Sequence, residues 1–214
     1  MAKTSSHCAL ALLLPLWGMA VQAHQQTGTS LEICDDLGCV HQTEVHMEAA
    51  LLARLDRLFQ PAPADALEER RRIRQAIALL EQQAGTQSPI HLDRGRNPDI
   101  DARLPAGGVW PLAANRQGHP DVRGQLDCVA ESRNTTRFLR LLAGRGLLHF
   151  HRVLEPAFRA PKIFDQHWSA QIAVRTDGHR YVVDSWFLDN GEPPYIQRLK
   201  PWLGKQALPH DGVE

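Results

Sequence analysis

Three stretches of the chain place apolar residues every three or four positions, which is the spacing of an amphipathic helix. The first stretch, residues 43–59, stops before two nearby prolines. The second begins after Asp65, a predicted N-cap, has Glu68 three residues later as in a capping box, and ends at Gly85. We expect these two helices to form a hairpin that packs on the rest of the domain. The basic run EERRRIR in the second helix is interpreted as a solvated face, because acids flank it.

The third helical stretch covers residues 127–143 and keeps one face small or apolar. Asp127 is its predicted N-cap, and Gly144 follows its last residue. Cys128 is therefore expected in the first turn of this helix.

Beyond this helix the pattern changes to the β-branched and aromatic composition of strands. Residues 147–154 predict one strand, and Pro156 and Pro161 predict a loop after it. Residues 167–175 and 180–188 predict an antiparallel hairpin, because an Asp-Gly pair lies between them. Helices followed by antiparallel strands favour an α+β fold, with the cysteine-bearing helix packed on the sheet.

The beginning of the chain has the pattern of a secretory signal peptide. Lys3 is the one charged residue (Lys, Arg, Asp or Glu) before Glu32, and an apolar run follows it. The sequence Val-Gln-Ala, which ends at Ala23, has the small-x-small pattern of a cleavage site. We therefore expect residues 1–23 to be removed and the rest to act in the periplasm or outside a bacterial cell. Lys plus Arg and Asp plus Glu both number 24, and this balance argues against nucleic acid or an anionic membrane as partner.

The remaining residues, 24–214, are expected to form one domain. A helical N-terminal part (24–85) is followed by a long loop (86–124) and a core (125–214). The loop has no lasting period and is rich in Pro, Gly, Asn, Asp and Arg. We interpret it as ordered rather than as a linker, because it carries enough apolar mass to pack, namely Ile100, Leu104, Val109, Trp110 and Leu112.

Three cysteines remain after the predicted cleavage, an odd number for an oxidising compartment. Cys34 and Cys39 flank Asp-Asp-Leu-Gly, which can form a tight turn, so we expect a disulfide between them. A redox role for this pair is disfavoured, because four residues separate the cysteines rather than the two of a C-x-x-C motif. Cys128 is left unpaired, either as a buried structural thiol or as a nucleophile.

A nucleophilic reading of Cys128 requires a thiolate, a base and a group that orients the base. The N-terminus of a helix lowers the pKa of a thiol, although the neighbouring Asp127 acts in the opposite sense. His167 opens one predicted strand, and Asp184 lies on the next. A two-residue turn at Asp-Gly would place Asp184 opposite Gln171, so its contact with His167 needs an earlier turn centre or a bulge. Asp189 is the alternative partner of His167.

The segments QLDCVAES, HWSAQIAV and YVVDSWF follow one another in the order helix, strand, strand. This order resembles the transglutaminase-like superfamily, and in particular the bacterial transglutaminase-like cysteine proteinases, which carry a GDCEDYA-like helix start, then His, then an acid in a V-L-D-N strand. The resemblance covers residues 124–190, about a third of the chain. It implies a papain-like thiol fold with a catalytic triad of Cys128, His167 and Asp184.

The resemblance also implies an oxyanion hole made by the backbone N–H of Cys128 and an upstream side chain. Gln125 is the nearest candidate, and Trp110 and Asn115 are others. The family's calcium-binding acids after the cysteine are replaced here by Val129, Ala130 and Glu131. We therefore expect no metal and no cofactor. His149 and His151 alternate on the predicted strand at 147–154, but no third ligand completes a zinc site.

The resemblance implies an exported cysteine hydrolase (a thiol protease or peptidase) or an acyltransferase that acts on an amide bond of a protein or peptide substrate. The alternative is a catalytically inactive binding or scaffold module with the same fold. Rapid labelling of Cys128 by a thiol probe, dependent on His167, would distinguish the enzyme from the inactive module.

Overall fold

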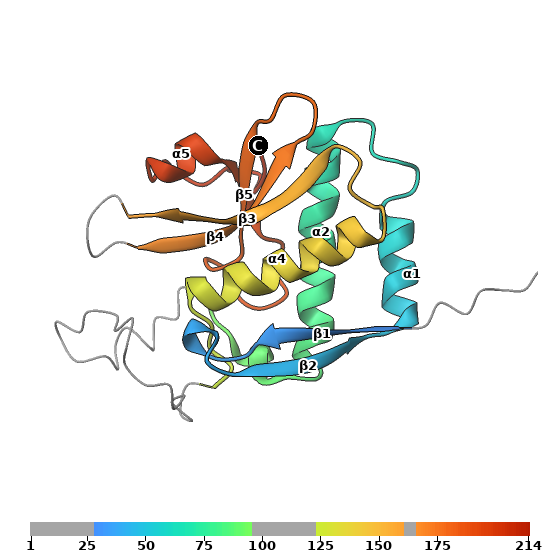
Figure 1. Cartoon of the computed structure of the whole chain (residues 1–214), viewed down its shortest axis with the longest axis vertical. Coiled ribbons are helices and arrows are strands. Elements are labelled where there is room, and N and C mark those ends of the chain that lie inside the picture. The colour runs from blue at the N-terminus through green and yellow to red at the C-terminus, as the bar shows by residue number, and fades with distance from the viewer. Residues whose placement is uncertain (1–27, 96–122, 161–165) are drawn as a thin grey trace, which may run out of the picture.

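The computed structural model describes residues 28–95, 123–160 and 166–214. The described residues form a mixed α+β structure (Figure 1). Its elements, in chain order, are β1 (Thr29–Cys34), η1 (Leu37–Cys39), β2 (Gln42–Met47), α1 (Ala49–Leu58), α2 (Ala66–Gly85), η2 (Pro89–Leu92), α4 (Cys128–Gly144), β3 (His151–Arg159), β4 (His167–Val174), β5 (Arg180–Asp184), β6 (Tyr195–Arg198) and α5 (Leu199–Leu203). None of the described helices is long and apolar enough to cross a membrane.

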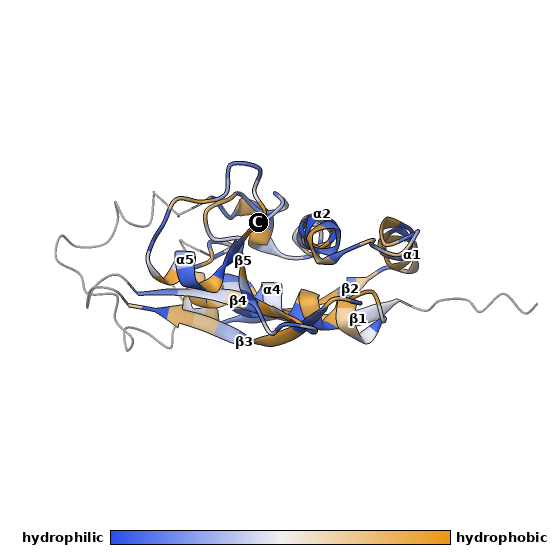
Figure 2. Ribbon diagram, turned by 90° about the horizontal axis from the view of Figure 1, so that it is seen from above, coloured by the Kyte–Doolittle hydropathy of each residue, from blue (hydrophilic) through white to orange (hydrophobic). Residues whose placement is uncertain are grey.

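Two antiparallel sheets flank α4. The smaller sheet pairs β1 with β2, and the larger has the order β3-β4-β5-β6. In Figure 1, α4 lies between the two sheets, and it contacts β1 on one side and β3 and β4 on the other. Figure 2 shows α1 and α2 nearly end-on, both on the same side of β1 and β2. The helix that begins at Cys128 is thus held on several sides by elements distant in sequence.

The apolar residues at helical spacing in α2 and α4 are buried in the core, as the sequence predicted. Fully buried residues from α1, α2, α4 and both sheets make one cluster, in which each large aliphatic or aromatic side chain stabilises the fold by about 1.5–3 kcal/mol. Its members include Ile33, Val45, Leu52, Ile73, Ile77, Leu80, Phe138, Leu139, Leu142, Ala170, Ile172 and Ile196.

The prediction of a helix over residues 43–59 is wrong in its first part. Residues 42–47 form β2, and the helix starts only at Ala49. In β2, Val45 and Met47 are buried while their neighbours are more exposed, the alternation of a half-buried strand. Val45 lies opposite Leu31 of β1. The N-terminal part therefore begins with a β-hairpin rather than with a helix.

The predicted helix caps are confirmed at both long helices. Asp65 accepts a hydrogen bond from the Glu68 N–H at 2.7 Å at the start of α2. Asp127 accepts one from the Ala130 N–H at 2.8 Å at the start of α4. These caps satisfy backbone donors that the first turn of a helix leaves unpaired.

The strand predicted over residues 147–154 lies further along the chain, as β3. Leu147 and Leu148 instead pack into the core after α4 ends. The loop predicted at Pro156 is wrong. Pro156 lies inside β3, where the register shifts between Leu154 and Ala157. A proline is tolerated at such an irregularity because no ladder hydrogen bond needs its missing N–H.

The predicted hairpin of β4 and β5 is confirmed, with β5 ending at Asp184 rather than at residue 188. Gln171 lies opposite Val182, and Ala170 lies opposite Val183. One further step of this register places Asp184 opposite Ser169 of β4. Ser169 is two residues after His167, so Asp184 and His167 lie on the same face of the sheet. The turn is therefore centred one residue earlier than a two-residue turn at Asp-Gly would be.

Candidate active site

His167 and Asp184 form a buried hydrogen-bonded pair at the end of the larger sheet. Their side chains are 3% and 2% exposed, and His167 Nε2 lies 2.7 Å from Asp184 Oδ2. The same carboxylate oxygen accepts a hydrogen bond from Trp202 Nε1 at 2.9 Å. Asp189, the alternative partner, lies elsewhere and accepts hydrogen bonds from Arg94 and the Gly95 N–H.

This contact defines the tautomer of His167. A carboxylate can only accept, so the hydrogen bond requires the proton on Nε2 and leaves a basic lone pair on Nδ1 of the neutral ring. Nδ1 is buried and has no hydrogen-bond partner in the described part of the chain. The ring thus has one nitrogen oriented by an acid and another that is unoccupied.

Cys128 lies beside this pair. It is the first residue of α4 and is partly buried. Its sulfur lies against the backbone N–H of Trp168, the residue that follows His167, and is close enough to Asp184 for the two charges to interact. The structure therefore brings the three predicted residues to one place, from the start of a helix, the start of a strand and the end of the neighbouring strand.

The thiol is not ionised in this environment. Burial raises the pKa of Cys128 to about 12, with further contributions from the negative charges of Asp127 and Asp184. The N–H of Trp168 and the N–H of Cys128 itself act in the opposite sense but do not outweigh burial. The N–H at the start of the helix thus lowers this pKa, as expected, but the net pKa is raised because burial is the larger effect. At neutral pH the thiol is therefore the dominant form, so attack by the sulfur requires a base.

Aromatic side chains surround the His167 ring. The ring centroids of Trp186, Phe187 and Trp202 lie 4.9, 5.5 and 5.6 Å from that of His167. They restrict rotation of the imidazole and exclude water from its hydrogen bond to Asp184. Sequence reasoning did not single out Trp202, because no local motif connects it to a carboxylate 18 positions earlier.

Gln125, the predicted oxyanion donor, lies three residues before the cysteine. Its Nε2 donates to the Leu92 carbonyl, and its Oε1 accepts from the Arg94 N–H at 3.4 Å. The Gln125 amide is thus bound to the last residue of η2 and to the segment that follows it. Trp110 and Asn115, the other candidates, lie outside the described residues, as do the predicted signal peptide and residues 96–122 of the predicted loop.

A cluster of three buried acids lies beneath the first turn of α4. Asp93 accepts the Leu126 N–H at 2.7 Å and shares a hydrogen bond with Glu131. Glu81 accepts hydrogen bonds from Ser185 and the Gly191 N–H. Burial raises the pKa of Asp93 to about 7 and those of Glu81 and Glu131 well above the ordinary value. In the described ranges no group of three or more His, Cys, Asp or Glu side chains is arranged to hold a metal ion.

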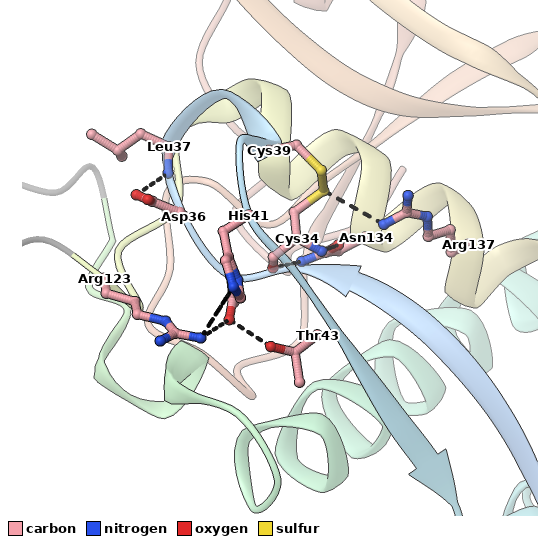
Figure 3. A network of polar contacts seen from close by, with 10 residues as sticks. Cys34, Asp36, Leu37, Cys39, His41, Thr43, Arg123, Asn134 and Arg137 are labelled. Atoms are coloured by element: carbon pink, nitrogen blue, oxygen red, sulfur yellow. Dashed lines mark hydrogen bonds and ion pairs between the residues drawn. A yellow bond between two sulfur atoms is a disulfide. The ribbon is translucent and has the colours of Figure 1, made fainter. Parts of the chain in front are cut away.

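The predicted disulfide between Cys34 and Cys39 is confirmed, and its loop is attached to α4 (Figure 3). Asn134 of α4 accepts the Cys34 N–H at 2.7 Å and donates to its carbonyl at 2.8 Å. Within the loop, Gly38 adopts a positive φ of 65° and donates its N–H to Asp127 Oδ2 at 2.9 Å. The disulfide loop therefore contacts the residue that caps α4 next to Cys128.

The site has no counterpart of known function among the proteins compared with this chain. No protein-family model, no curated protein and no solved structure matches this chain. Belonging to the transglutaminase-like superfamily therefore remains a proposal.

Proposed function

We propose that the protein is an exported transglutaminase-like cysteine hydrolase or acyltransferase that acts on an amide bond of a protein or peptide. The observation that carries this proposal is the state of His167. Its Nε2 is bound to Asp184 and its buried Nδ1 has no hydrogen-bond partner among the described residues, while the Cys128 thiol lies against the N–H of the next residue, Trp168. The Cys34–Cys39 disulfide fits a protein of the periplasm or the cell exterior, because disulfides persist in oxidising compartments.

In the proposed reaction, His167 Nδ1 takes the proton of the Cys128 thiol as the sulfur attacks the amide carbon. Asp184 stabilises the imidazolium that forms. The negative charge on the former carbonyl oxygen is stabilised by the Cys128 N–H, and the remaining N–H of the Gln125 amide is the second donor in this proposal.

His167 then returns the proton to the leaving nitrogen, and a thioester on Cys128 remains. Water or an amine attacks the thioester, with His167 taking its proton. The sulfur departs and regains that proton, which restores the thiol and neutral imidazole. With water the product is a carboxylic acid, and with an amine it is a new amide.

The raised pKa of the thiol bears on the order of the proposed steps. Because burial favours the neutral form of Cys128, the proposed reaction moves the proton as the sulfur attacks. Reactivity should therefore depend strongly on His167 and not on a thiolate that exists beforehand.

Labelling of Cys128 by iodoacetamide at pH 7 tests the proposal, with peptide mapping to separate Cys128 from Cys8. We expect labelling of the native protein to be faster than that of the His167→Ala variant by about 100-fold. Equal rates in the two folded proteins would remove the proposal.

The second candidate function is a non-catalytic binding or scaffold module. The same raised pKa favours it, since a partly buried, neutral thiol is also what an inert structural cysteine presents. Labelling that occurs only when the native protein is denatured would select this candidate.

A further inference from the structure

Trp202 of α5 makes a polar contact to the candidate site that ordinary packing does not require. Its side chain is fully buried, with 1% of the residue exposed. Its indole N–H donates to Asp184 Oδ2 at 2.9 Å, the same oxygen that accepts from His167 Nε2. The ring also lies against His167, with 5.6 Å between centroids.

Two donors on one oxygen restrict the orientation of the Asp184 carboxylate. An aspartate side chain can rotate about two bonds, and one hydrogen bond leaves the carboxyl plane free to turn about that contact. A second donor from another direction removes this freedom, and hydrogen bonds to a charged group are stronger than those between neutral groups. The oxygen that orients His167 is thus held from the side of α5.

Trp202 is itself held by Arg159 of β3. The Arg159 guanidinium lies over the indole at 4.5 Å from its centroid, and Nη1 donates to the Trp202 carbonyl at 2.5 Å. Arg159 is also the cross-strand neighbour of His167 in the β3–β4 ladder. A continuous set of contacts therefore runs from Arg159 through Trp202 and Asp184 to His167.

We propose that Trp202 is a positioning residue of the active site, whose indole N–H holds the Asp184 carboxylate in the orientation that keeps the proton of His167 on Nε2. This inference rests on the proposed function. It identifies a residue that acts on the base through Asp184, without contact to the substrate.

The test is a double-mutant cycle on the rate at which iodoacetamide labels Cys128 in the full chain. Trp202→Phe removes the N–H and keeps an aromatic ring, and Asp184→Asn removes the carboxylate. We expect Trp202→Phe alone to slow labelling by about 10-fold, the loss that corresponds to about 1.4 kcal/mol. In the Asp184→Asn background the same substitution should change the rate by less than about 2-fold, because residues that act through one another are not additive.

A purely structural role predicts a different result, namely equal slowing in both backgrounds, and would overturn the inference. Trp186→Phe is the matched control, since this ring also lies against His167 but makes no hydrogen bond to Asp184 within the described residues. Its expected change is less than about 3-fold, because Phe keeps an aromatic ring against His167 and no hydrogen bond to Asp184 is lost.

One further variant and two further outcomes keep the test decisive. If Trp202→Phe does not fold, replacement of Trp202 by benzothienylalanine keeps the shape of the bicyclic ring and substitutes sulfur for the N–H, and the same loss is expected. If His167→Ala and Asp184→Asn slow labelling but neither change at Trp202 does, the positioning role is wrong and the proposed function stands. If His167→Ala has no effect, the proposed function fails first.

Discussion

Two buried histidines of this protein each share a hydrogen bond with a carboxylate, and they differ in what their second ring nitrogen meets. His151 Nδ1 lies 2.8 Å from Glu69 Oε1, and His167 Nε2 lies 2.7 Å from Asp184 Oδ2. The side chains of the first pair are 0% exposed, and those of the second are at most 3% exposed. By distance and burial the two pairs are nearly equal.

The His151 pair is fully engaged in holding the fold. Glu69 of α2 also accepts the backbone N–H groups of His149, Phe150 and His151, and His151 Nε2 lies 3.2 Å from Arg70 Nη1. The pair connects α2 to the beginning of β3 and leaves neither ring nitrogen for chemistry. His167, in contrast, has a buried Nδ1 without a hydrogen-bond partner among the described residues, and the Cys128 thiol lies against the N–H of the next residue, Trp168. A buried histidine and acid are therefore a candidate catalytic pair only when the second ring nitrogen is left without a partner and a group that needs a base lies nearby.

The largest effect is expected from removal of the structural pair. Glu69→Ala leaves a buried histidine beside Arg70 and three backbone donors without their acceptor. We expect the free energy of unfolding in urea to fall by about 3–5 kcal/mol, with the labelling rate of Cys128 in the folded fraction unchanged. A slower rate in folded protein would mean that the two regions are coupled.

Asp184→Asn tests the second pair. An amide can also donate, so it no longer dictates the tautomer of His167. We expect the labelling of Cys128 at pH 7 to slow by about 10- to 100-fold, with a loss of stability much smaller than that of Glu69→Ala. A stability loss of equal size with an unchanged rate would assign Asp184 the structural role of Glu69.

The disulfide should affect stability more than reactivity. Replacing Cys34 and Cys39 by Ala opens a short loop, and we expect a loss of about 2 kcal/mol in the free energy of unfolding. The labelling of Cys128 should slow by less than about 3-fold, because Asp127 still caps α4 through the Ala130 N–H. A larger slowing would show that the contact from Gly38 to Asp127 also positions the thiol.

The smallest effect concerns pH. Although burial opposes it, hydrogen bonds from His151 and the backbone lower the pKa of Glu69. Its contribution to stability is therefore present above its ordinary value of 4.5 and lost as the pH falls through the pKa of the folded state.

The pKa shift of Asp93, and so its effect on stability as the pH changes, has the opposite sign to that of Glu69. Its pKa rises from 3.8 to about 7, so its contribution is present below pH 3.8 and declines as the pH rises through 7. Asp93→Asn should flatten this decline, measured as the difference in the free energy of unfolding between urea titrations at pH 5 and pH 8. An unchanged difference between the two pH values would mean that Glu81 and Glu131 govern it.

The sequence predicted the parts of the site that local patterns determine. Asp127 marks the start of α4 and so places Cys128 at the tip of the helix, and the Asp-Gly pair predicts the hairpin that carries His167 and Asp184. The register of that hairpin needed the structure, because a shift of one residue in the turn changes which residues face each other.

Other features depend on packing between distant segments. The apolar positions within residues 43–47 are compatible with both a helix and a strand. They form a strand because they pair with β1. The pKa of Cys128 depends on burial against β4, and the role of Trp202 depends on how α5 meets β5. No local signal in the sequence carries that information.

The most direct test of the comparison measures the iodoacetamide labelling rate of Cys128 at pH 7 in His167→Asn and His151→Asn, each shown to be folded by circular dichroism. The account predicts a loss of about 100-fold for His167→Asn and an unchanged rate for His151→Asn. Equal rates in His167→Asn and the native protein would contradict it.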